Sequence, residues 1–232
     1  MGDIMTNDFD HRKGHRERLR EKFLQNKLCD YELLELLLAY AIPRIDVKPI
    51  AKNLLRAFGG VREIMDAPME KLVAISGIKQ NTAIFIKALR EVMMLDYKSY
   101  FASNPIFHDF KAFENYCKSA LLQKQEEEFH VLYLDAGYRL ILDELHSHGT
   151  IDWSAVYPRE IVKRALNLNA SIVILLHNHP TGAGTFSNDD IAVTNELQTM
   201  LKSIGIEIFD HFLVANGLLY SAKNMFLFRS KM

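Results

Sequence analysis

Residues 171–190 read SIVILLHNHPTGAGTFSNDD, an apolar run that ends on two histidines and continues through a glycine-rich loop into a helix start. Successive side chains of a strand point to opposite faces, so His177 and His179 project to the same side and can reach one ion. Asp190 would join them from the first turn of the following helix. Two imidazoles and one carboxylate suit Zn²⁺, and three protein ligands leave the fourth tetrahedral position for water. The stretch therefore predicts one zinc ion in a site built for metal-assisted hydrolysis.

The polar residues at this helix start also have a structural interpretation. A carboxylate in the first turn is favoured by the helix dipole without any metal, which applies to Asp190 and equally to Asp189. Asp189 is therefore the alternative ligand. Ser187 is suited to cap the same helix, and its hydroxyl could also hydrogen-bond a tetrahedral intermediate. These two roles of Ser187 are compatible.

A run of glutamates supplies candidates for proton transfer, which hydrolysis requires in addition to a metal. Glu126, Glu127 and Glu128 precede the strand-like stretch FHVLYLD at residues 129–135. Alone, such a triplet is usually a solvated segment. Beside the predicted metal site, we expect one of the three to face the zinc.

The remaining histidines of this half are interpreted as structural. His211, in the stretch DHFLV, could approach the metal indirectly, but packing between strands is the preferred interpretation. His146 and His148 share the spacing of the predicted ligands, yet no acidic residue follows at a matching distance. We therefore expect neither to bind the metal.

The pattern of apolar residues predicts a helical domain followed by an α/β domain. In the first half, apolar residues recur at helical spacing at 31–40, 47–58 and 82–95. In the second half, helical stretches at 110–122, 158–168 and 188–203 alternate with strand-like stretches at 129–135, 138–145, 171–177, 206–215 and 218–221. The segment SYFASNPIFHD breaks the helical pattern, so we place a helical domain at 1–100, a linker at 101–109 and the α/β domain at 110–232.

Composition indicates an ordinary globular protein. The chain has 28 Lys and Arg against 29 Asp and Glu, a formal net charge of -1, so no global field recruits nucleic acid or an anionic membrane. Cys29 and Cys117 stand far apart without a C-x-x-C pair, which argues against a disulfide framework or a thiolate zinc site. We find no secretory signal and no apolar run of ~18 residues, so we expect a cytoplasmic protein without a membrane partner.

The histidine stretch carries a family pattern. H-x-H-P, seven residues between His179 and Ser187, and two more before Asp190 resemble the JAMM motif of MPN-domain metalloproteins. Around it, EEEFHVLYLDAGYRLI, HGTIDWSAVYPREIVKRALNLNASIVILLHNHPTGAGTFSNDD and DHFLVANGLLYS resemble the bacterial RadC family over nearly all of residues 110–222.

The resemblance implies a cytidine-deaminase-like α/β fold of the JAB1/MPN type, in which the zinc ligands map onto His177, His179 and Asp190. It maps the catalytic glutamate onto Glu127, which stands two residues before Phe129. By alternation Glu127 shares a strand face with Phe129, whereas Glu126 and Glu128 point away. Related JAMM enzymes hydrolyse peptide or isopeptide bonds, which implies that Glu127 deprotonates the attacking water and that Ser187 supports the oxyanion.

The loop after the histidines departs modestly from the family's commonest sequence. Thr181 stands where Ser is frequent, and AGTF at 183–186 lacks the proline that commonly precedes the motif serine. The loss of proline frees one backbone angle, and we expect Gly184 to add flexibility. Zinc binding should be unaffected because the ligands are unchanged.

The helical half contains a stretch that resembles a helix–hairpin–helix element, LVAISGIK at residues 72–79. Gly77 allows a tight turn whose backbone amides, with Lys79 nearby, can approach a DNA phosphate without reading sequence. Lys48, Lys52 and Arg56 could extend a basic face; the alternative is that these cations are simply solvated. We expect the basic run at 12–22 to be a solvated helix, and Asp46 beside Arg44 has no assigned chemical role.

Two functions are therefore considered. The first is a JAMM-type zinc hydrolase that acts on peptide or isopeptide bonds, with the helical domain positioning it on DNA or a partner. The second is a DNA-associated repair or recombination module in which the metal domain is structural or nucleolytic. A purely structural zinc site is disfavoured, because such sites usually have four protein ligands.

Overall fold

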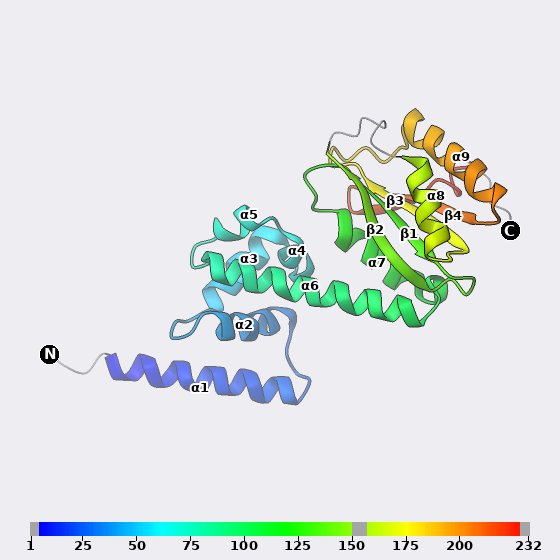
Figure 1. The fold of residues 1–232 in the computed structure, drawn as a ribbon. Helices are drawn as coiled ribbons and strands as arrows, with labels where there is room; N and C mark the ends of the chain where they lie inside the picture. Colours follow the sequence, from blue (N-terminus) through cyan, green and yellow to red (C-terminus); the bar gives the residue numbers. More distant parts are fainter. Residues whose placement is uncertain (1–4, 150–156, 228–232) are drawn as a thin grey trace. The chain divides into compact units, whose positions relative to one another are not determined.

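The structure, a computed structural model, describes residues 5–149 and 157–227 (Figure 1). The segments 1–4, 150–156 and 228–232 lie outside the described residues, and so do the side chains of residues 5–13. The segment 150–156 belongs to the sequence that resembles RadC. The chain divides into two compact units, Met1–Val92 and Met93–Met232. The first is helical, and the second combines helices with a sheet, as predicted.

The first unit is built from helices of very different lengths. They are α1 (Met5–Leu24), α2 (Asp30–Ala41), α3 (Lys48–Phe58), α4 (Val61–Asp66), α5 (Met69–Val73) and the first part of α6 (Gln80–Ser103). Helices α2 to α6 contribute apolar residues to one shared core, and on α3 the buried residues are Ile50, Ala51 and Leu54. The helix ends at Gly59, whose φ of +93° is the left-handed conformation favoured at helix C-termini.

The second unit contains a five-stranded mixed sheet in the order β2-β1-β3-β4-β5. The strands are β1 (Glu128–Leu134), β2 (Leu140–His148), β3 (Ile172–Asn178), β4 (Glu207–Ala215) and β5 (Leu218–Ser221). Only the β3–β4 pair is parallel, and α9 (Asn188–Ser203) forms its crossover. Asn216 and Gly217, with φ of 50° and 73°, make the predicted hairpin turn between β4 and β5.

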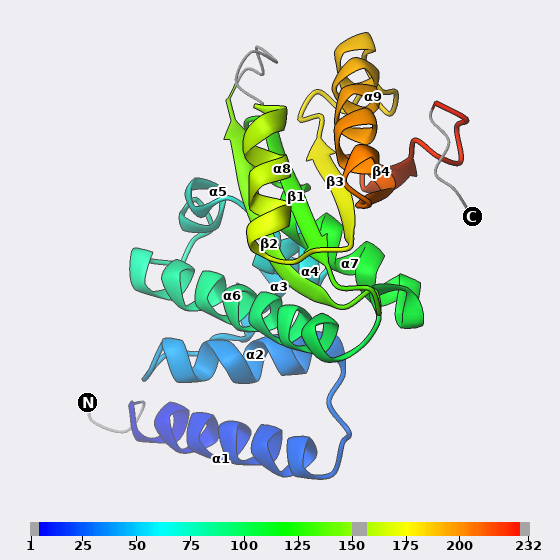
Figure 2. The same cartoon turned by 45° about the vertical axis from the view of Figure 1, so that its right-hand side comes forward.

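Helices cover both faces of the sheet (Figures 1 and 2). Val173 and Leu175 of β3 pack with α8 (Pro158–Asn167) and α9, whereas Ile174 and Leu176 pack with α7 (Phe110–Leu121) on the other face. Strand alternation therefore directs His177, the next residue of the first set, toward the α8–α9 side. Residue 127 precedes Phe129 and Val131 of β1, which also belong to this face.

The prediction of a linker at 101–109 was wrong, because this segment forms helices that pack in the core of the second unit. Helix α6 continues past residue 95 to Ser103, and a 3-10 helix, η1, follows at Ile106–Asp109. Phe101 and Ile106 are fully buried in the core of the second unit. The Ser, Asn and Pro residues of the segment end a helix, but the apolar residues between them belong to the core.

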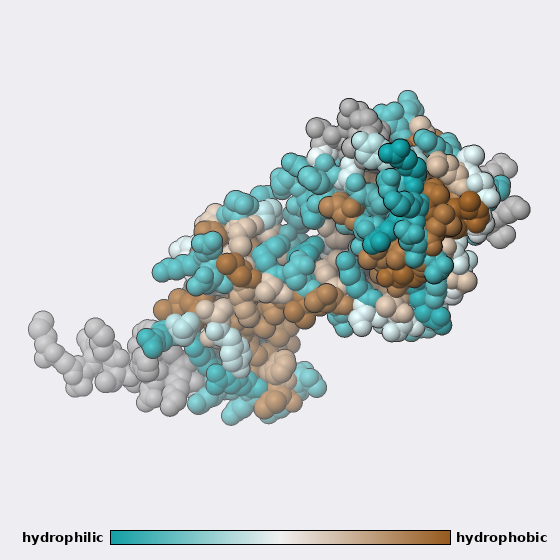
Figure 3. All heavy atoms as spheres, viewed as in Figure 1, coloured by the Kyte–Doolittle hydropathy of each residue, from teal (hydrophilic) through white to brown (hydrophobic). Residues whose placement is uncertain are grey.

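No helix in the described part of the chain could span a membrane. Hydrophilic and hydrophobic residues are interspersed on the face seen in Figure 3. Within residues 5–149 and 157–227, every helix is too short or too polar to cross a bilayer.

Candidate metal centre

The predicted ligands converge where β3 ends and α9 begins. One potential ligand atom from each of His177, His179 and Asp190 lies within 4.8 Å of the others. The Nε2 atoms of the two histidines are 3.1 Å apart, and His177 Nε2 is 3.3 Å from Asp190 Oδ1. His177 and Asp190 are fully buried, and the His179 side chain is 11% exposed. Asp189 is exposed outside this cluster, so the alternative ligand is not supported.

A hydrogen-bonded relay fixes the orientation of His177. The hydroxyl of Thr194 donates its proton to the carbonyl oxygen of Asp190 at 2.6 Å. Thr194 Oγ1 lies 2.7 Å from His211 Nδ1 and, because its own proton is already donated, must accept from that ring nitrogen. Burial lowers the pKa of His211, so the ring is neutral and its Nε2 accepts from His177 Nδ1 at 2.8 Å. The relay leaves the lone pair of His177 Nε2 directed at the cluster.

The loop after β3 orients the second histidine in the same way. His179 Nδ1 donates to the carbonyl oxygen of Ala183 at 2.9 Å, which leaves Nε2 facing His177 and Asp190. The loop is held in turn by Asn216, whose side-chain nitrogen donates to Gly182 O at 2.6 Å. At Gly184 an added Cβ would lie 2.6 Å from the Tyr220 ring. The expected flexibility at Gly184 is therefore wrong: this glycine permits close packing.

Only one of the two oxygens of the Asp190 carboxylate has hydrogen-bond partners among the described residues. Its Oδ2 accepts from the backbone N of Ser187 at 2.6 Å and from the Ser187 hydroxyl at 2.7 Å, which forms a capping box at the start of α9. Its Oδ1 is buried without a hydrogen-bond partner. Burial favours a raised pKa for Asp190, but the adjacent His177 and His179 imidazoles, when protonated, and the hydrogen bonds from Ser187 outweigh it and hold the pKa far below its usual range.

This donor set fits a divalent cation. Two imidazole lone pairs and an unpaired carboxylate oxygen face one point, an arrangement that is electrostatically unfavourable without a positive charge between them. Two nitrogens and one oxygen are ligands that zinc accepts, and the carbonyl and histidine partners behind the imidazoles are those typical of metal-binding histidines. His177, His179 and Asp190 could thus hold one metal ion.

Comparison with known families agrees with this geometry. Residues 107–227, more than half of the chain, match the RadC-like JAB domain, and residues 11–84 match the UPF0758 N-terminal domain. The chain belongs to the RadC family. In this RadC protein the JAB match contains the whole candidate metal centre, and the N-terminal match covers most of the first unit.

Glu127 of this RadC protein is held beside the histidines by backbone contacts on both sides. Asn178 accepts from the backbone N of Glu128 at 2.8 Å through Oδ1, and its Nδ2 donates to the Glu126 carbonyl at 3.1 Å. The Glu127 carbonyl accepts from Gly149 N at 3.0 Å. The nearby Asp190 carboxylate, whose Oδ2 lies 3.6 Å from His179 Nε2, is the main cause that raises the pKa of His179, and the charge of Glu127 contributes.

The neighbouring glutamates have other partners. Glu128 binds Lys124 at 2.8 Å and lies 3.2 Å from His130 Nε2, while the Glu126 side chain is 67% exposed. Neither belongs to the group of three potential ligands. Of the triplet, only Glu127 has a charge that contributes to the raised pKa of His179.

Ser187 occupies its predicted cap position. Its Oγ accepts from Asp190 N at 3.0 Å while its proton is donated to Asp190 Oδ2. To donate to a substrate oxyanion, this hydroxyl would have to release Asp190. The structure therefore shows Ser187 as a helix cap. Its role in stabilising an oxyanion stays a prediction.

Three residues behind the site have roles that sequence reasoning missed or undervalued. His211 is buried between strands as expected, but it also contacts His177 directly. Thr194 completes the relay one helical turn after Asp190, a spacing that could have indicated it. Asn178 stands between the two histidines, where strand alternation turns it toward the opposite face.

The other residues singled out in the sequence lie elsewhere. His146 contacts the Tyr133 hydroxyl at 2.8 Å, and His148 is 73% exposed. In the first unit, Gly77 lies between α5 and α6 with φ of +91°. Lys79 is exposed immediately before α6.

Proposed function

We propose that this RadC protein is a zinc-dependent hydrolase that acts on peptide or isopeptide bonds. The observation that carries the proposal is the unpaired Asp190 Oδ1, buried beside two histidine Nε2 atoms whose tautomers are set by the residues behind them. Glu127 adds a carboxylate at the edge of this cluster. The JAMM resemblance favours peptide or isopeptide bonds as the substrate class.

Each residue of the centre has a proposed task. Zinc bound by His177, His179 and Asp190 would act as a Lewis acid and lower the pKa of water toward ~7. Glu127 would accept the proton of the attacking water and return it to the leaving amine. Ser187 holds Asp190 in place and could stabilise the oxyanion if its hydroxyl turns toward substrate.

Hydrolysis by purified full-length protein tests the proposal. Peptides and isopeptide-linked branched peptides would be incubated with zinc-loaded protein and with protein stripped by a chelator. We expect cleavage with zinc, loss of cleavage after stripping, and recovery when zinc is added back. Cleavage that persists in the stripped protein, or in a His179→Ala variant, would exclude this metal centre as its source.

The relay behind His177 gives a prediction for metal affinity. Thr194→Val keeps the shape of the side chain but removes the hydroxyl that accepts from His211. Loss of a partner behind a metal ligand typically weakens affinity about 10- to 100-fold, and we expect a change of that order in competition with a chromophoric chelator. Thr199→Val is the matched control, since Thr199 makes the same backbone contact four residues back on α9 but is exposed. Equal affinity in the two variants would contradict the relay.

A second proposed function is association with DNA through the first unit. The backbone at Gly77 has a conformation that disfavours other residues, and an added Cβ would lie 2.6 Å from Ile50. Lys79 is exposed beside this turn, at the start of the long helix α6. A glycine turn with a cation at a helix start suits a DNA phosphate.

Anisotropy of labelled duplex, branched and single-stranded DNA at increasing salt tests this second function. Phosphate contacts must weaken as salt rises, and Lys79→Gln should reduce the slope of log affinity against log salt by about 1. Lys71→Gln, which removes an exposed charge from α5, should leave the slope unchanged. Absence of binding at low salt would reject the DNA contact.

A further inference from the structure

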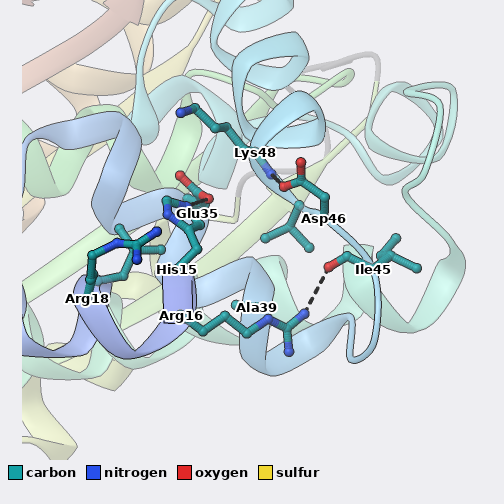
Figure 4. A pocket seen from close by; sticks show the side chains of 10 residues that line it. His15, Arg16, Arg18, Glu35, Ala39, Ile45, Asp46 and Lys48 are labelled. Atoms are coloured by element: carbon teal, nitrogen blue, oxygen red, sulfur yellow. Dashed lines mark hydrogen bonds and ion pairs between the residues drawn. The ribbon is translucent and has the colours of Figure 1, made fainter. Parts of the chain in front are cut away.

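The first unit contains a cavity that is separate from the predicted DNA turn. Its volume is about 430 Å³, within the range of small-molecule sites, and it lies between α1, α2 and the start of α3 (Figure 4). Apolar wall residues are Leu19, Ala39, Ile45 and Val47; the polar residues are His15, Arg16, Arg18, Glu35, Asp46 and Lys48. Asp46, to which the sequence assigned no chemical role, thus lies in the wall of this cavity.

A buried carboxylate lies in this cavity wall with one oxygen unsatisfied. Glu35 is 1% exposed, and its Oε1 is paired with His15 Nε2 at 2.6 Å. Its Oε2 is buried and has no hydrogen-bond partner among the described residues. Figure 4 shows the carboxylate among the polar groups of the cavity. An orphaned acceptor is costly in a native fold, and a ligand that donates an N–H to it would remove the cost.

The cavity also presents cations that are not used by the fold. Arg16 is committed, since its guanidinium donates to the carbonyls of Ile42 and Ile45 at 3.2 and 2.9 Å. Within the described part of the chain, the side chains of Arg18 and Lys48 have no carboxylate partner. Asp46 accepts from the backbone N of Lys48 at 3.0 Å and so helps to start α3.

The charges restrict the kind of ligand. Arg16, Arg18 and Lys48 outnumber Glu35 and Asp46, so the cavity favours a ligand with net negative charge. An ammonium or guanidinium ligand would satisfy Glu35 but would be repelled by these cations. The ligand must therefore combine an anionic group with a neutral N–H donor.

We propose that this cavity binds a nucleotide. The phosphate contacts Arg18 and Lys48, the base donates an amino N–H to Glu35 Oε2, and the apolar residues contact the base and sugar. Adenine, cytosine and guanine carry exocyclic amino donors, whereas uracil and thymine present carbonyls on either side of a single N–H. Those carbonyls face the carboxylate unfavourably. The site thus selects amino-bearing bases over uracil or thymine.

Isothermal titration of the full chain at low salt tests this selection. AMP, CMP, GMP and UMP are compared with ribose 5-phosphate and inorganic phosphate. We expect saturable binding of AMP, CMP and GMP, with UMP and the two base-free phosphates weaker by about tenfold, the loss of one hydrogen bond to a charged group. Single-stranded oligo-dA and oligo-dT then distinguish a free nucleotide from one in a strand: tighter binding of oligo-dA than of AMP assigns the site to single strands.

Two kinds of variant separate the phosphate contacts from the base contact. Arg18→Gln and Lys48→Gln should each weaken the binding of all nucleotides about tenfold. Lys27→Gln, which removes an exposed charge outside the cavity, should leave that binding unchanged. Glu35→Gln should raise the affinity for UMP relative to that for AMP, because an amide can donate to a carbonyl as well as accept. A purely structural role of Glu35 would weaken all four nucleotides equally, and thermal melts establish that each variant is folded.

The outcomes decide the proposal. The proposal is supported if the protein prefers amino-bearing bases and if Glu35→Gln reduces that preference. Unchanged nucleotide binding in Lys79→Gln would show that the cavity is distinct from the DNA turn. Three results would overturn it: no saturable binding, equal binding of AMP and UMP by the unmodified protein, or inorganic phosphate binding as tightly as AMP. None of these outcomes depends on the metal centre.

Discussion

Replacing His177 or His179 by alanine is expected to abolish tight zinc binding, lowering the metal content from about one ion per chain to under ~0.1. Each imidazole supplies one of three ligands whose nearest atoms already face one another within 4.8 Å. With one ligand removed, two remain, which is below the three that catalytic zinc sites use. Metal analysis after dialysis against zinc-free buffer measures the loss.

Substitution at the helix start provides the matched comparison. Asp189→Ala removes an exposed carboxylate and should leave the metal content unchanged. Asp190→Ala should abolish binding and also destabilise the apo protein by about 1 kcal/mol, because Asp190 completes the capping box with Ser187. Zinc at 1,000 times its Kd stabilises a protein by about 4 kcal/mol, so the thermal midpoint should rise with zinc in the unmodified chain and in Asp189→Ala. A zinc-dependent rise in His179→Ala would contradict the ligand assignment.

The pH dependence of zinc binding follows from the state of His179. The Asp190 carboxylate, 3.6 Å away, raises the pKa of His179 above its ordinary value, so a proton occupies Nε2, the proposed ligand atom, at low pH. In the apo protein this protonated pair adds stability at low pH, and the contribution is lost as pH rises through the raised pKa. Zinc must displace that proton, so affinity should increase with pH through the same range. Titration calorimetry in buffers of different ionisation enthalpy should detect the released proton.

The convergence of His177, His179 and Asp190 could be predicted from sequence because local rules place these side chains. Strand alternation sets His177 and His179 on one face, and the helix start supplies Asp190 from the same stretch. His211 depends instead on parallel pairing of β4 beside β3, in which His211 is opposite Leu175. The contact of Asn178 with the backbone around Glu127 joins segments fifty residues apart in the chain. No local pattern contains such a contact.

The fold shows the same division between local and long-range information. The hairpin at Asn216 was predictable because its turn requires positive φ at successive residues. The limits of the second unit were not, because the Ser, Asn and Pro residues near 104 signal only the end of a helix. Burial of Phe101 and Ile106 depends on α7 and the sheet, which follow later in the sequence.

Glu127→Gln is expected to retain one zinc ion and to lose hydrolysis by about 10²- to 10⁴-fold, the usual contribution of general acid–base catalysis. The amide has almost the shape of the carboxylate but cannot accept and return a proton at neutral pH. Glu127 is outside the group of three ligands, so metal content should not change. Metal analysis and peptide cleavage on the same preparation separate the two properties. Undiminished turnover would refute the assigned role.

The neighbouring glutamates and Asn178 determine how specific this result is. Glu126→Gln changes an exposed residue of the same triplet and should leave both metal content and hydrolysis unchanged. Asn178→Ala removes the side chain that holds the backbone on both sides of Glu127. This variant should keep its zinc and show a smaller loss of hydrolysis than Glu127→Gln, because the carboxylate remains but is less well positioned. If Asn178→Ala also lowers hydrolysis in the Glu127→Gln background, then Asn178 acts through something other than Glu127.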